Sequence, residues 1–86
     1  MTLRLRTEEL NWRQIDDEIV ALDGRDGAYL AITGSGALLW PLLVAGATPG
    51  QLVSTLVDSY GIDESRAAAD TEVFVSALSD QGLLAA

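Results

Sequence analysis

The sequence predicts a small α+β domain in which a short antiparallel sheet of about three strands precedes three helices. Two observations predict it. Before residue 33, apolar and polar residues tend to alternate with the period of two that is typical of strands, and after it apolar residues recur at helical spacing. The chain has 86 residues and contains no internal repeat, linker or low-complexity segment, so we expect one domain over residues 1–86.

Strand patterns occupy the first third of the chain. Residues 2–6 alternate apolar and charged side chains and are expected to form a first strand, with residues 12–15 as a short second piece. The runs 18–22 and 28–32 flank the turn 23–27, whose Gly and Asp residues permit positive φ. These two runs therefore predict a β-hairpin.

The second strand of this hairpin has two distinct faces. Because side chains alternate along a strand, Leu30 and Ile32 are expected to point one way and Tyr29 and Ala31 the other. After this strand the period changes. Thr33 or Ser35 is placed to cap a helix that runs to Gly46. Pro41 lies inside that helix, which predicts a kink or a late start.

Two further helices follow, each with local start and stop signals. Thr48 is expected to cap the second helix, which ends at Gly61, and Asp63 caps a third that runs to Gln81 and stops at Gly82. The core is expected to be mostly aliphatic with three aromatic anchors, namely Trp12, Trp40 and Phe74. Two helical stripes are expected to face it: Leu52, Leu56 and Tyr60; and Ala67, Thr71, Phe74 and Leu78.

Charge and composition exclude several classes of function. Thirteen acids face five arginines, giving a net charge of −8, so the chain would repel nucleic acid unless its scattered arginines clustered. The sequence has no His, Cys or Lys, so the usual nucleophile–base pairs and thiolate metal sites cannot form. We expect a non-catalytic cytoplasmic protein with no cofactor, metal or nucleic acid partner. The apolar stretch 37–45 is too short to span a membrane.

A series of motifs runs from residue 16 to residue 84. An acidic turn, 16–18, precedes the apolar strand, and a glycine-containing turn follows it. The later motifs are Tyr29 to Trp40, Thr48 to Leu52, Asp70/Phe74/Leu78 at four-residue spacing, and Gly82-Leu83-Leu84. In this order and spacing the segment from Ile15 to Leu84 resembles the PqqD-like family, the peptide-binding domains called RiPP recognition elements. Thr33, Ser35-Gly36 and Pro41 depart from the family pattern at the first helix.

The resemblance implies a winged helix-turn-helix-like fold that binds the leader of a ribosomally made precursor peptide. The leader would add as a strand to the edge near residues 28–32, in a groove against the last helix, and strand addition supplies main-chain hydrogen bonds whatever the leader's sequence. The domain would then present the leader to separate maturation enzymes, the leader peptidase and cyclase of a lasso-peptide pathway. A peptide chaperone for a radical-SAM enzyme is the alternative within the family.

Two other classes of function fit the same order of elements. A winged-helix DNA-binding regulator would share the fold, but its recognition helix should carry Arg or Lys, and the expected last helix has one arginine among several acids. A structural subunit whose edge strand pairs with a second copy is the other alternative.

The resemblance places the peptide-binding residues on two elements. The edge strand would offer its backbone, with Tyr29 or Leu30 lining the groove, and one flank of the last helix would offer side chains because Asp70 matches the family's acid. The expected residues are Ala28, Tyr29, Leu30, Ala31 and Ile32 in the strand, and Arg66, Ala67, Asp70, Val73, Phe74 and Ala77 in the helix. The opposite flank, with Ala68, Glu72, Val75 and Ser79, is the alternative.

Overall fold

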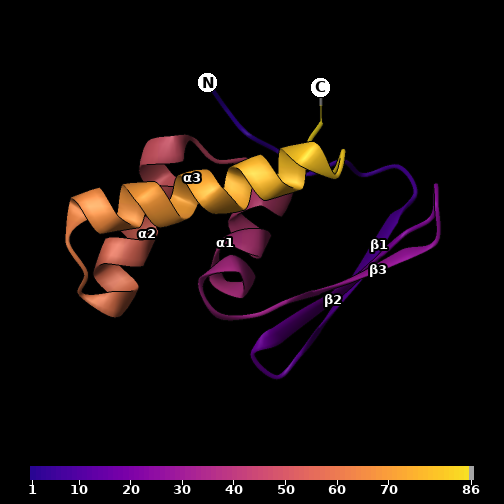
Figure 1. Cartoon of the computed structure of the whole chain (residues 1–86), viewed down its shortest axis with the longest axis horizontal. Helices are drawn as coiled ribbons and strands as arrows, with labels where there is room; N and C mark the ends of the chain where they lie inside the picture. The colour runs from indigo at the N-terminus through magenta and orange to yellow at the C-terminus, as the bar shows by residue number, and fades with distance from the viewer. Residues whose placement is uncertain (86) are drawn as a thin grey trace.

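Three strands and three helices follow one another along the chain in the computed structural model, which describes residues 1–85 (Figure 1). The strands are β1 (Leu10–Ile15), β2 (Glu18–Asp23) and β3 (Ala28–Ile32). The helices are α1 (Gly34–Ala45), α2 (Pro49–Tyr60) and α3 (Glu64–Asp80). The α+β class and the order of strands before helices are confirmed.

The N-terminal residues 2–6 do not form a strand of the sheet, so that prediction is wrong. Leu3 instead bridges Ala47, between α1 and α2, and Leu5 bridges Leu84 near the other end of the chain. Leu5 is buried and Leu3 half-buried. The alternation in this segment therefore records burial against the helices and the C-terminal segment, rather than pairing with β2.

The sheet has the order β1-β2-β3, and both pairings are antiparallel. On β2, Ile19 and Ala21 are fully buried, and their partners on β3 are Ile32 and Leu30. Leu30 and Ile32 consequently belong to the face that packs on the helices, whereas Tyr29 lies on the other face. Among the described residues β3 has a neighbour on one side only, so its second edge carries backbone groups with no strand partner.

The three helices begin where their local signals predict. α1 starts at Gly34, directly after Thr33, so the predicted late start does not occur, and Pro41 sits at an exposed position inside the helix. The Thr48 side chain accepts a hydrogen bond from the backbone N–H of Gln51 in a capping box. Asp63 accepts one from the N–H of Arg66 at 2.8 Å.

The core lies between the inner face of the sheet and the helices. Its largest fully buried side chains are Trp40, Ile19, Leu39, Leu43, Leu52, Leu56 and Leu83. Trp12 is 40% exposed and packs edge-on against Trp40 with ring centroids 6.2 Å apart, so the expectation of Trp12 as a core anchor is wrong. Tyr60 is likewise half exposed. Trp12 belongs to the edge strand β1, and its ring contacts Trp40 at the margin of the core.

Candidate peptide-binding site

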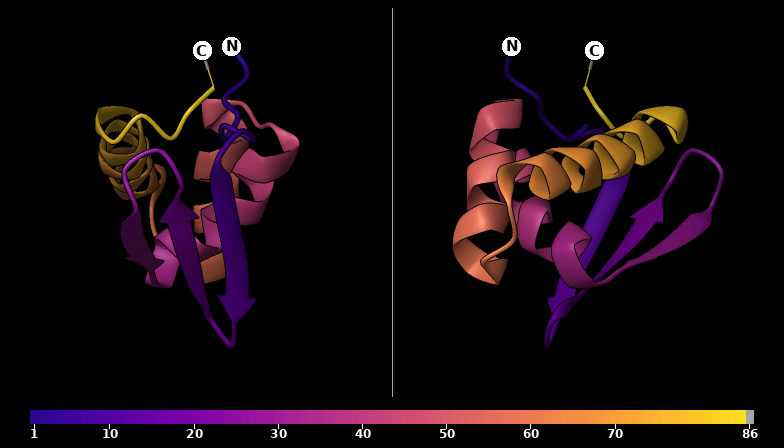
Figure 2. Two further views of the ribbon diagram at one scale, coloured as in Figure 1. Left: turned by 90° about the vertical axis from the view of Figure 1, so that its right-hand side faces the viewer. Right: turned by 60° about the vertical axis from the view of Figure 1, so that its left-hand side comes forward.

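The free edge of β3 and the helix α3 lie on the same side of the molecule. The left view of Figure 2 shows β3 as the outer strand on the side of α3, and β1 as the outer strand on the opposite side of the sheet. The backbones of β3 and α3 approach each other at few points. An extended peptide that paired with β3 would therefore lie beside α3.

A glycine allows the end of β3, the start of α1 and the middle of α3 to meet. Gly36 is buried, and a Cβ at this position would lie 2.8 Å from Cγ2 of Ile32 and 2.9 Å from Cε1 of Phe74. Such distances are too short for real carbon contacts. The absence of a side chain at Gly36 thus lets the half-buried Phe74 ring pack beside Ile32, at one end of the candidate site.

Gly36→Ala is expected to destabilise the domain by about 1–3 kcal/mol, because the new methyl group must displace Phe74 and Ile32 in a packed region. Urea unfolding measures the loss. Gly50→Ala is the matched control, since the site of its Cβ is open and alanine is favoured in a helix, so this variant should be as stable as the parent or more so. Equal midpoints for the two variants would contradict the packing role.

The two flanks of α3 have different neighbours. Glu64 and Ala68 line a hollow of about 410 Å³ together with residues of α2, so this flank faces α2. On the other flank, Asp70 is half-buried and lies 3.8 Å from the Arg66 guanidinium. The predicted helix residues lie at different depths. Ala67 is fully buried, as its place in the core-facing stripe predicts, whereas Arg66 and Ala77 are exposed.

Val73 and Ala77 lie on the solvent side of α3. Val73 is 72% exposed, and the two residues contribute to a shallow hollow of about 480 Å³. An apolar side chain this exposed on a helix needs no explanation by itself. Its position on the flank away from α2 nevertheless makes it reachable by a peptide that lies over α3.

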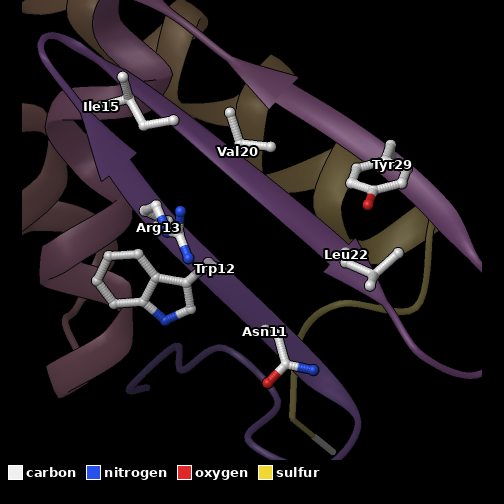
Figure 3. Close-up of a pocket in the computed structure, with 7 residues that line it drawn as sticks. All are labelled: Asn11, Trp12, Arg13, Ile15, Val20, Leu22 and Tyr29. Atoms are coloured by element: carbon white, nitrogen blue, oxygen red, sulfur yellow. The ribbon is translucent and has the colours of Figure 1, made fainter.

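The outer face of the sheet carries Tyr29. Figure 3 shows its ring on the same side of the strands as Val20 and Leu22, with the helices behind. These residues and Arg13 contribute to a hollow of about 300 Å³, and Tyr29 is 73% exposed. Of the two side chains considered for the groove, Leu30 is therefore the one on the side of the helices.

A buried carboxylate near the start of β3 was not foreseen from the sequence. The side chain of Asp23 accepts hydrogen bonds from Nη2 of Arg6 at 2.7 Å and from Nη2 and the backbone N–H of Arg25 at 3.1 and 3.0 Å. The hydrogen bonds from Arg25, and then that from Arg6, hold the pKa of Asp23 well below its usual range against the opposing effect of burial. The sequence feature that could have indicated this ion pair is Asp23 followed two residues later by Arg25 in the turn.

Asp23→Asn is expected to lower stability at neutral pH, with a deficit that narrows in acid. Because the folded-state pKa is depressed, the carboxylate stabilises the fold above its ordinary pKa of 3.8, and this contribution is lost as the pH falls toward the folded-state value. Urea midpoints of both proteins at neutral pH and at about pH 3 measure the change. If the stability difference between Asp23→Asn and the parent were the same at both pH values, the ionised Asp23 carboxylate could not be its cause.

Metal-ligand clusters and membrane-spanning helices are both absent from the described residues. Within residues 1–85 no group of three or more acidic, His or Cys side chains is placed to hold a metal ion. In the same part of the chain, none of the helices combines the length and the apolar character needed to cross a bilayer.

Comparisons with known proteins agree with this geometry. Residues 18–84 match the family model described as coenzyme PQQ synthesis protein D (PqqD). A solved structure described as "TbiB1 in Complex with the TbiA(beta) Leader Peptide" is similar with 28% identity and a TM-score of 0.86, over 94% of this chain and 93% of that one. "Lasso peptide synthetase B1 complexed with the leader peptide" is similar with 30% identity and a TM-score of 0.85, over 98% of each chain. No curated protein matches.

Proposed function

The chain belongs to the PqqD family, and from this premise we propose that it binds the leader segment of a ribosomally made precursor peptide. The observation that carries the proposal is the edge of β3 beside α3, which has no strand partner among residues 1–85, in a fold shared over nearly its whole length with two leader-bound proteins. The protein acts without catalysing a reaction, as a peptide-binding accessory protein of the cytoplasm.

In the proposed complex the leader forms a fourth strand beside Ala28–Ile32. Backbone pairing supplies affinity that does not depend on sequence, and pockets for alternate side chains supply selectivity. Leader side chains on the inner side would meet Leu30, Phe74 and the Asp70 flank of α3. Five or so paired residues with two or three buried anchors are consistent with Kd values of about 10⁻⁸ to 10⁻⁶ M.

We further propose that the leader is passed to separate enzymes. The 30% identity with a lasso peptide synthetase B1 favours a leader peptidase, and a cyclase after it, as the partners. The family model favours the alternative, a peptide chaperone for a radical-SAM enzyme. Pull-down with each enzyme class from the same gene neighbourhood separates them, since only the true partner should be retained in the presence of leader.

Titration of a fluorescent leader peptide from a neighbouring precursor gene tests the binding. Saturable binding with a Kd below about 1 µM is expected. The absence of saturable binding at protein concentrations up to about 100 µM would refute the proposal. N-methylation of single leader residues tests strand addition, because only alternate residues donate their N–H to β3 and the losses should recur with period two. Salt-sensitive binding of duplex DNA would instead support the alternative that the protein is a winged-helix DNA-binding regulator.

A further inference from the structure

Two arginines connect the β2–β3 hairpin to the C-terminal end of α3. Asp23 is the last residue of β2 and pairs with Ala28, the first residue of β3. The Asp23 carboxylate binds the guanidinium groups of Arg6 and Arg25, and its side chain is 4% exposed. This ionic cluster therefore sits directly at the point where the edge strand begins.

Both guanidinium groups also reach the segment that directly follows α3. Nη1 of Arg6 donates to the carbonyl oxygen of Gly82 at 2.7 Å, and Nη2 of Arg25 donates to the same oxygen at 3.1 Å. Gly82 has φ of +70°, and a Cβ there would lie 2.8 Å from Nη2 of Arg25. Carbonyl groups beyond a helix C-terminus lack intrahelical donors and favour nearby cations. The cluster thus joins three segments: the N-terminal segment, the hairpin and the end of α3.

The backbones of β3 and α3 have little direct contact with each other. At the far end of β3, Ile32 and Phe74 meet over Gly36. Between these two ends the backbones of β3 and α3 approach each other closely at few points. The Asp23 cluster therefore links the start of β3 to the segment that follows α3, in a region where strand and helix have little direct backbone contact.

We propose that Asp23, Arg6 and Arg25 form a positioning cluster that holds the edge of β3 at a set distance from α3, so that a peptide strand enters a preformed channel. The inference rests on the proposed leader binding and adds residues that do not touch the leader. Preorganisation raises affinity because the complex then loses less conformational entropy on binding. Without the cluster, the hairpin and the end of α3 move independently and the leader must order them.

Leader titration with Asp23→Asn and Arg25→Ala tests the cluster. Each variant is expected to weaken leader binding about tenfold or more at a temperature where circular dichroism shows it folded. Thr48→Ala is the matched control, because it removes the side-chain cap of α2 and so lowers stability, while it leaves the hairpin untouched. The variant that carries both substitutions should bind the leader no more weakly than the single variant with the lower affinity. Each substitution alone already disrupts the same cluster, so the two losses should not add.

Amide hydrogen exchange on the free protein provides a readout that lost stability alone would not produce. The amides of Tyr29 to Ile32 should exchange faster in Arg25→Ala than in Thr48→Ala at matched global stability. Arg25 is 46% exposed, so this variant keeps the test available if Asp23→Asn does not fold.

Unchanged leader affinity and unchanged exchange in Arg25→Ala would overturn the positioning role. Failure of the parent protein to bind any leader would instead refute the proposed function. The exchange comparison would in that case still decide whether the cluster holds β3.

Discussion

Trp40→Ala is expected to remove a large part of the stability of this domain, so that the variant unfolds at a much lower urea concentration than the parent. Trp40 is fully buried and is the largest of the fully buried side chains. Truncating a buried tryptophan costs about 3–5 kcal/mol through lost burial and the cavity left behind. A domain of this length has a total stability of roughly 4–13 kcal/mol.

The indole N–H of Trp40 has no hydrogen-bond partner among the described residues. The expected loss therefore comes from apolar volume rather than from a broken hydrogen bond, and Trp40→Phe should retain more stability than Trp40→Ala. Urea unfolding followed by far-UV circular dichroism measures both.

Trp12→Ala is the matched control for the tryptophan series. Trp12 is exposed at the rim of the sheet and makes an edge-on contact with Trp40, which is worth about 0.5–1.5 kcal/mol beyond its burial. Its replacement should cost clearly less than that of Trp40. Equal midpoints for Trp12→Ala and Trp40→Ala would show that the two rings contribute alike and that the core is not centred on α1.

Val73→Asp is expected to weaken leader binding at least tenfold, about 1.4 kcal/mol, while leaving the fold intact. The side chain is 72% exposed, so a carboxylate there remains hydrated and costs the free protein little. In the complex the same carboxylate would be covered by the peptide without a cation to pair with. Fluorescence anisotropy with a labelled leader measures the change in Kd.

Ser79→Asp provides the control for added charge. Ser79 is exposed on α3 and lies on the other flank, which turns away from the side that carries Asp70 and Ala77. Ser79→Asp should therefore bind the leader with a Kd near that of the parent protein. If Val73→Asp binds as the parent does and Ser79→Asp does not, the leader lies along the opposite flank and the choice of flank is wrong.

Much of the fold could be predicted because its signals are local. The glycines after the helices, the caps at Thr48 and Asp63, and the alternation in β3 each act within a few residues. Residues 2–6 show the limit of such reasoning. Their alternation matched a strand, but Leu3 and Leu5 are ordered by the α1–α2 connection and by the C-terminal segment, which are distant in sequence.

The sequence by itself determined the order of the elements, the two faces of β3 and the resemblance to the PqqD family, which the family model confirms. Only the tertiary structure decided that residues 2–6 pack against the helices and the C-terminal segment instead of joining the sheet, and that Asp23 is linked to Gly82 through Arg6 and Arg25. The physical reason is the range of the interactions. Periodicity specifies which face of an element is buried, whereas the element that covers it, and the partner of a buried charge, depend on packing between residues far apart in the chain.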